Sequence, residues 1–172
     1  MNIQFLAKKF GMTNDEARTL IKVARQYDSA EEFESSLSGQ SRYVQGQVYQ
    51  PRGIESALAM RLEGGSLAEY DSLSKIEWLQ EYPRLNGSII LYRVTPDGKP
   101  ITPGDYVSNS KSYVQLHKRS NLGGKGIITK VKSTLDSIFP ADGPKEFWYA
   151  PKWIENFDAN IFYDYVYNFG VL

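Results

Sequence analysis

The chain has no cysteine, a single histidine and no excess of charge of either sign. Its 20 lysine and arginine residues balance 20 aspartate and glutamate residues over 172 positions. The lack of cysteine excludes disulfide bonds, thiolate nucleophiles and cysteine-based metal sites. The single histidine, His117, disfavours a catalytic zinc site, which normally takes two or three histidine ligands. We therefore expect no metal, and a serine triad could only use His117.

Long apolar runs are absent as well. No stretch approaches the roughly 18 apolar residues that a membrane-spanning helix requires. The opening MNIQFLAKKF is too polar for a secretory signal. We therefore expect a cytoplasmic protein with no membrane partner. The zero net charge indicates no polyanion that the whole molecule would bind, and the oligomeric state stays open.

The first half of the chain has the residue spacing of helices. In MTNDEARTLIKVARQY, Thr13 is followed three residues later by Glu16, a capping-box pattern that begins a helix. Ser29 and Glu32 repeat this pattern at the next helix. We expect further helices over residues 54–62 and 66–82, and a loop or short strand pair over residues 41–53.

The second half changes to strand patterns. The spacing predicts a helix over residues 110–118 and a turn or short helix over 133–139, while the aromatic residues 158–172 fit either a strand or a helix. Strands are expected over residues 88–94, 106–109, 127–132 and 147–151. The predicted fold class is α+β, with a helical N-terminal region over residues 1–85 packed on a small β-rich core over residues 86–172.

Charge is unevenly distributed along the chain. Residues 111–132 contain six bases and no acid, whereas residues 55–81 contain six acids and two bases. A local basic face in a neutral protein suits a small or local anion, such as a dinucleotide or an RNA end, better than a long duplex. Alternatively, the two stretches face each other and neutralise their charges.

Two charged side chains on predicted strands are candidates for chemistry. Strand alternation places Ile89, Leu91 and Arg93 on one face. The guanidinium of Arg93 then either binds a phosphate in a bidentate manner or forms a structural ion pair. Glu146 begins an aromatic strand and shares a face with Trp148, where its orientation and pKa can be set by its surroundings. The alternative is a solvated glutamate on an edge strand.

The stretch YVSNSKSY joins a strand to a helix. Ser108 and Ser110 share one strand face, and Ser110 is placed to cap the helix that follows. A helix N-terminus offers amide donors and partial positive charge to a phosphate or to a developing negative charge. Tyr113, in the first turn, could stack on a flat heterocycle. The simpler alternative is a capped turn without a ligand.

The order of these elements resembles the arginine–serine–glutamate class of mono-ADP-ribosyltransferases. Residues 88–152 are similar to phage- and mobile-element-associated ADP-ribosyltransferase-like domains. The similarity lies in an LYRV strand, the segment PGDYVSNSKSYVQLH, the loop SNLGGKG and the strand EFWYAP. The resemblance implies a small split β-sheet core that clamps NAD, which is the substrate.

The resemblance also implies which residues bind NAD. Arg93 would bind a phosphate and brace the site, and Lys111 would help to hold the pyrophosphate. Ser108 and Ser110 would hold the nicotinamide ribose and orient the catalytic glutamate. Tyr113 would pack near the nicotinamide.

For catalysis, the resemblance implies that Glu146 stabilises the oxocarbenium-like transition state as nicotinamide leaves, with Arg93 and Ser110 completing the catalytic set. Apart from the resemblance, we expect His117 to pack on its own helix, whereas a His117 that faces the cleft could serve as a base or contact the adenine ribose. Two positions depart from the family pattern and leave the acceptor open. Asn109 stands in the middle of the serine element, and Pro144 stands where many members carry a second Glu or Gln.

The implied function is NAD-dependent mono-ADP-ribosylation of a host protein or nucleic acid, by a phage effector or counter-defence protein in the host cytoplasm. Two alternatives stay open. One is a non-catalytic inhibitor on the same scaffold, such as an anti-CRISPR-type blocker. The other is a small metal-free ribonuclease toxin that uses His117 and the basic stretch.

Overall fold

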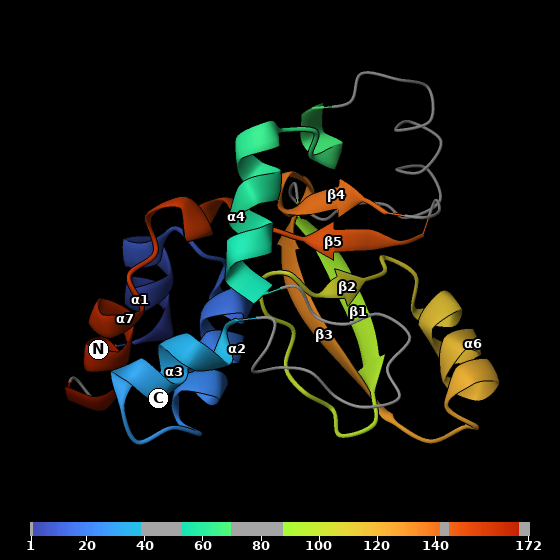
Figure 1. The fold of residues 1–172 in the computed structure, drawn as a ribbon, viewed down its shortest axis with the longest axis horizontal. Coiled ribbons are helices and arrows are strands. Elements are labelled where there is room, and N and C mark those ends of the chain that lie inside the picture. Colours follow the sequence, from blue (N-terminus) through green and yellow to red (C-terminus); the bar gives the residue numbers. More distant parts are fainter. Residues whose placement is uncertain (1, 39–52, 70–87, 142–144, 169–172) are drawn as a thin grey trace.

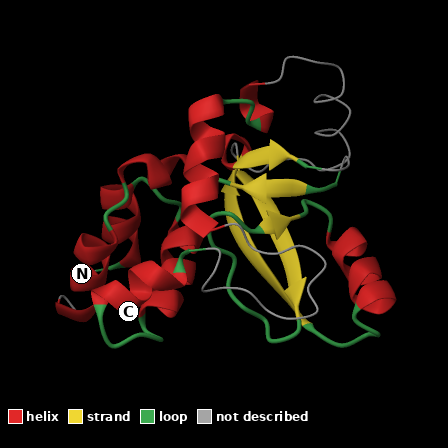
Figure 2. Ribbon diagram, in the orientation of Figure 1, coloured by secondary structure: helices red, strands yellow, loops and turns green. Residues whose placement is uncertain are grey.

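The computed structural model describes residues 2–38, 53–69, 88–141 and 145–168. Helices and two small antiparallel sheets make it an α+β protein (Figure 1, Figure 2). A cluster of helices lies on one side of the sheets, and one helix lies on the opposite side. Three predicted features lie outside the described residues: positions 41–52 of the loop or short strand pair expected over 41–53, the part of the helix expected over 66–82 that follows residue 69, and Pro144.

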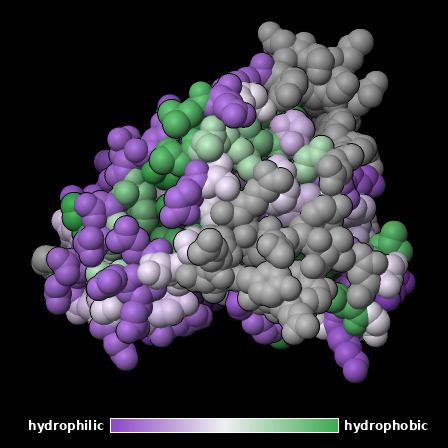
Figure 3. Space-filling view, in the orientation of Figure 1, coloured by the Kyte–Doolittle hydropathy of each residue, from purple (hydrophilic) through white to green (hydrophobic). Residues whose placement is uncertain are grey.

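The helical cluster begins with three helices, α1 (Ile3–Phe10), α2 (Asn14–Ala24) and α3 (Ala30–Ser36). The predicted capping box of α2 is confirmed. Thr13 Oγ1 accepts a hydrogen bond from the Glu16 amide at 3.1 Å, and Glu16 Oε1 accepts one from the Thr13 amide at 2.9 Å. Ser29 caps α3 by accepting from the Glu32 amide. Hydrophilic side chains cover much of the outer surface of this cluster (Figure 3).

The aromatic C-terminal segment forms a helix, α7 (Ala159–Asn168), that joins this cluster. The ring of Phe162 stacks on Phe33 of α3, with 5.9 Å between the ring centroids. The apolar interior of the helical cluster therefore takes side chains from both sides of position 86. Its largest fully buried members are Phe33, Phe162, Leu6 and Leu37.

The first sheet pairs two long strands, β1 (Ser88–Thr95) and β3 (Ile127–Thr134). They are antiparallel, with Ser88 opposite Thr134 and Thr95 opposite Ile127. The predicted alternation along β1 is confirmed, because every second side chain from residue 89 to residue 95 is buried. This pattern directs Arg93 toward the interior, in line with Ile89 and Leu91.

The second sheet has three short strands in the order β2 (Tyr106–Val107), β5 (Phe147–Tyr149) and β4 (Ile138–Pro140). Within residues 133–139, where a turn or short helix was expected, a 3-10 helix covers Leu135–Ser137, but the strand β4 that follows it was not foreseen. Three residues are too few to show an alternation pattern in sequence. Beyond β2, Ser108 forms a bridge with Tyr92 of β1. The two sheets are therefore joined at one point.

Helix α4 (Gly53–Glu63) lies between the helical cluster and the sheets (Figure 1). Its residue Arg61 has a side chain only 7 % exposed. The guanidinium donates to the carbonyl oxygens of Asp136 and Ala150, and pairs with the carboxylates of Asp136 and Glu155, each at 3.0 Å. One planar fork thus holds α4 to the segments before β4 and after β5.

We expect Arg61→Lys to reduce the free energy of unfolding by about 2 kcal/mol, because one ammonium group cannot satisfy the acceptors that the fork reaches. The matched control is Arg18→Lys, whose side chain is 55 % exposed and lies 3.9 Å from Asp15. That change should stay within about 0.5 kcal/mol. Urea denaturation of both variants measures the difference, and equal losses would contradict the role given to Arg61.

Candidate active site

Arg93 links the two sheets from the buried face of β1. The residue is 8 % exposed. Its Nη1 donates a hydrogen bond of 2.7 Å to the carbonyl oxygen of Tyr106 in β2. The guanidinium therefore braces β2, while its charge lies at the junction of the sheets.

The serine element forms the turn between β2 and helix α6 (Lys111–Asn121). Ser108 exchanges two backbone hydrogen bonds with Tyr92, at 2.7 and 2.9 Å. The Ser108 hydroxyl then accepts from the Ser110 amide at 3.0 Å. The Ser110 hydroxyl accepts from the Tyr113 amide at 3.2 Å, which confirms the predicted helix cap. Both serines are at least 97 % buried, so this turn is fixed in place.

Asn109, between the two serines, differs from them. It is 8 % exposed, and among the described residues its Oδ1 has no hydrogen-bond partner. A buried acceptor without a donor costs roughly 1–3 kcal/mol. At this turn, the Oδ1 atom of Asn109 is therefore a buried acceptor for which the described part of the chain provides no donor.

Glu146 lies directly before β5, which begins at Phe147, and is half-buried. The Tyr113 hydroxyl donates a short hydrogen bond to Glu146 Oε1. This contact joins the first turn of α6 to the start of β5. Tyr113 and Glu146 were expected in one site, but the sequence carries no signal for the bond between them, because 33 positions separate the two residues.

His117 follows Tyr113 by one helical turn, so the two side chains share a face of α6. Partial burial lowers the pKa of His117 below its usual 6.5, and the positive charge of Arg93 lowers it further. The charge of Glu146 acts in the opposite direction and raises it. The imidazole therefore lies within electrostatic reach of both the guanidinium and the carboxylate.

The structure thus brings Arg93, the Ser108–Ser110 turn and Glu146 into one region of the molecule, with Tyr113 and His117 beside them. Lys111, at the start of α6, is exposed. The binding of NAD by these residues stays a prediction. Their arrangement offers a fixed cation, a held carboxylate and a neutral imidazole, a set that suits electrostatic stabilisation and proton transfer.

Because the chain has one histidine, proton NMR can follow the titration of His117 without assignment. We expect a pKa below 6.5. Glu146→Gln should lower it further, since it removes the charge that favours the imidazolium, and Arg93→Gln should raise it.

The free energy of unfolding should also decrease as the pH falls from 6.5 to the pKa of His117 in the folded protein, because the unfolded chain binds the proton more tightly. If the pKa of His117 is at or above 6.5 and neither variant changes it, then His117 does not lie within electrostatic reach of Arg93 and Glu146.

A second polar centre surrounds Glu16, which is 5 % exposed. Its Oε2 accepts hydrogen bonds from the hydroxyls of Ser133 and Tyr149 and from Trp153 Nε1, so the carboxylate joins α2 to β3, β5 and the following 3-10 helix over Lys152–Asn156. Burial and the charge of Glu16 raise the pKa of Tyr149 well above 10, which keeps its hydroxyl protonated. From the sequence, Glu16 was expected only as a capping residue.

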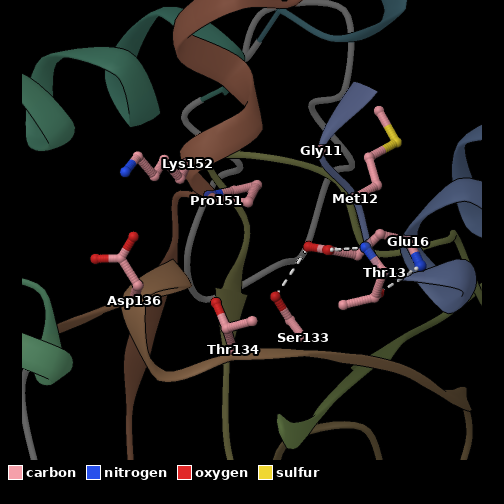
Figure 4. A pocket seen from close by; sticks show the side chains of 9 residues that line it. All are labelled: Gly11, Met12, Thr13, Glu16, Ser133, Thr134, Asp136, Pro151 and Lys152. Atoms are coloured by element: carbon pink, nitrogen blue, oxygen red, sulfur yellow. Dashed lines mark hydrogen bonds between the residues drawn. The ribbon is translucent and has the colours of Figure 1, made fainter. Parts of the chain in front are cut away.

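A cavity of about 410 Å³ opens beside this centre (Figure 4). Glu16 and Thr13 lie on one side of it, and Asp136 and Lys152 lie on the other. None of its lining residues belongs to the group around Arg93 and Glu146. The carboxylate oxygens of Glu16 already accept hydrogen bonds from two hydroxyls, the Trp153 indole and the Thr13 amide. We therefore interpret this centre as structural.

Glu16→Gln should lower the free energy of unfolding by about 2–4 kcal/mol. The new NH₂ group is a hydrogen-bond donor, and the groups around it are donors as well, so their hydrogen bonds are lost. Glu34→Gln, on the exposed side of α3, makes the same chemical change at the surface and should cost less than about 0.5 kcal/mol. Thermal or urea unfolding compares the two. Similar values for both variants would contradict the structural interpretation.

Among the described residues, no group of three or more acidic or histidine side chains could hold a metal ion. In the same part of the chain, no helix is long and apolar enough to cross a membrane. No protein-family model, curated protein or solved structure matches the chain.

Proposed function

We propose that the chain is an NAD-dependent mono-ADP-ribosyltransferase-like protein, acting as a phage effector or counter-defence protein on a host macromolecule. One observation carries the proposal. Three segments distant in sequence deliver the Arg93 guanidinium, the Ser108–Ser110 turn and the Glu146 carboxylate to one region. These are the residues that the resemblance to the arginine–serine–glutamate class selects.

The architecture supports the same proposal. The resemblance implies a small split β-sheet, and the chain has a two-stranded and a three-stranded sheet that meet at Tyr92 and Ser108. Arg93 stands next to this junction on β1, and Glu146 directly precedes Phe147, which pairs with Val107, so it lies at the end of the central strand β5 that is nearest to Ser108. A ligand held between these residues would lie across the junction of the sheets.

In the proposed reaction, the bond between C1′ of the ribose and the nicotinamide nitrogen breaks, and its electron pair leaves with nicotinamide. The sugar carbon becomes cationic until an acceptor atom forms the new bond to C1′ and releases its proton. The carboxylate of Glu146, oriented by the Tyr113 hydroxyl, would stabilise the developing positive charge. Arg93 and Lys111 would hold the pyrophosphate, whose charge does not change in this step.

We expect Glu146→Gln to reduce nicotinamide release from NAD by about 10²- to 10³-fold, the usual loss when one preorganised electrostatic group is removed from a transition state. The substitution is informative because glutamine Oε1 can still accept the Tyr113 hydrogen bond, so charge changes while shape is kept. Chromatographic detection of nicotinamide measures the rate.

Glu34→Gln serves as the control, since it removes the same charge on α3. Both variants should unfold at nearly the temperature of the unmodified protein. Nicotinamide release that is equal in all three proteins, or absent from the unmodified one with NAD and host lysate present, would refute the transferase proposal.

One observation favours a metal-free ribonuclease as the second candidate: His117 has a lowered pKa and lies near both Arg93 and Glu146. Its neutral imidazole would take the proton of a ribose 2′-hydroxyl, whose oxygen attacks the adjacent phosphorus. The bond to the 5′-oxygen then breaks, and that oxygen leaves as a hydroxyl after taking a proton from solvent. RNA cleavage that needs no NAD and is lost in His117→Ala would select this candidate. Stoichiometric inhibition of a host complex that survives Glu146→Gln would instead select the non-catalytic inhibitor.

A further inference from the structure

The chain carries a continuous run of 30 residues, 106–135, without an acidic side chain. The run covers β2, α6, the glycine loop after it and β3. It contains six bases, which are Lys111, Lys118, Arg119, Lys125, Lys130 and Lys132. All are exposed except Lys118, which is partly exposed. Positive charge is thus concentrated on one part of a protein whose net charge is zero.

This basic strip begins at the candidate active site. Helix α6 forms the edge of the molecule on the side away from the helical cluster (Figure 1). Tyr113 and His117 occupy the α6 face that meets Glu146, while Lys111 and Arg119 are exposed to solvent on the same helix. The strip continues through Lys125 in the glycine loop.

Two further features describe the strip, one in its middle and one at its β3 end. In the glycine loop, a Cβ added at Gly123 or Gly124 would meet no atom of the described residues within 4 Å, so these residues leave the backbone there open to a ligand. At the β3 end, the Asp15 carboxylate of α2 accepts a hydrogen bond of 2.6 Å from the Lys132 amide. An acidic group therefore lies beside the strip at Lys132, and the part of the strip away from this carboxylate runs from Lys111 to Lys130.

We propose that this strip docks a single-stranded nucleic acid, which is the acceptor of the ADP-ribosyl group. The inference rests on the proposed function and names its substrate class. Phosphates along a strand match several bases in a row, and their binding releases counterions. A cationic acceptor such as an arginine side chain would be repelled, and the strip is too short for a long duplex.

A membrane surface fits this part of the chain less well. An interfacial helix needs a broad apolar face, whereas α6 exposes one large apolar side chain, Leu116, among polar neighbours. A strand of nucleic acid can place Leu116 and the half-buried Tyr113 against bases while its phosphates meet Arg119 and Lys125.

The site chemistry agrees with an acceptor of this kind. A hydroxyl or ring nitrogen of the nucleic acid would attack C1′ of the ribose as nicotinamide leaves, and must lose its proton. His117 would take that proton, because burial and Arg93 lower its pKa and leave the imidazole neutral at neutral pH. The products would be the ADP-ribosylated strand, nicotinamide and one proton passed on to solvent.

The test compares two double charge reversals in the full chain. Arg119→Glu with Lys125→Glu changes the strip at positions with no proposed role in NAD binding. Lys8→Glu with Lys22→Glu changes net charge equally on exposed sides of α1 and α2. Fluorescence anisotropy with labelled 20-nucleotide single-stranded RNA and DNA measures binding at 50 and 200 mM salt.

We expect the strip variant to bind at least about tenfold more weakly, with a salt slope smaller by about two, because each lost phosphate contact removes about one unit. The control should bind within twofold of the unmodified protein. Radiolabel from NAD should transfer to the oligonucleotide with the unmodified protein and the control, and not with the strip variant.

The outcomes separate the docking strip from the proposed function. Nicotinamide release measured without oligonucleotide reports on the transferase alone, and it should be retained in the strip variant. The docking strip is overturned if nicotinamide is released but both double variants bind the oligonucleotide equally. It is also overturned if the radiolabel enters protein and no oligonucleotide. Preference for phosphatidylserine vesicles over the oligonucleotides overturns it too. Strip-dependent binding without nicotinamide release supports the docking surface and rejects its use in transfer.

Discussion

Two backbone hydrogen bonds between Tyr92 and Ser108 join the sheets, and the candidate site depends on them. They fix the end of β2 against the middle of β1, which places the Ser108–Ser110 turn beside the strand that carries Arg93. Helix α6 begins at the cap on Ser110, so its direction follows from the same junction. From the first turn of α6, the Tyr113 hydroxyl then reaches Glu146.

The residues with the strongest sequence signals are also those that the fold uses most. Arg93 bonds a backbone carbonyl, and both serines bond backbone amides. These contacts agree with the structural interpretations, in which Arg93 is an internal brace and the serines form a capped turn. They are also compatible with a functional role. A site that holds its groups before ligand arrives avoids reorganisation during the reaction.

Local patterns predicted much of this fold, and contacts between distant residues account for what was missed. The capping box of Thr13 and Glu16 and the alternation of β1 are encoded within a few positions, so both were foreseen. The aromatic segment before residue 169 was ambiguous because its helical form depends on packing against Phe33, far away in the chain. The bond between Tyr113 and Glu146 depends on sheet pairing, which no local pattern specifies.

The two buried or half-buried glutamates show why position decides role. Glu16 accepts from four donors in the described residues, which matches the roughly four acceptor positions of a carboxylate. Glu146 is more exposed and, in the same part of the chain, accepts a side-chain hydrogen bond from Tyr113. A carboxylate with its lone pairs occupied can only hold the fold together. A carboxylate that is oriented by the Tyr113 hydroxyl keeps acceptor capacity for a ligand, which supports the role proposed for Glu146.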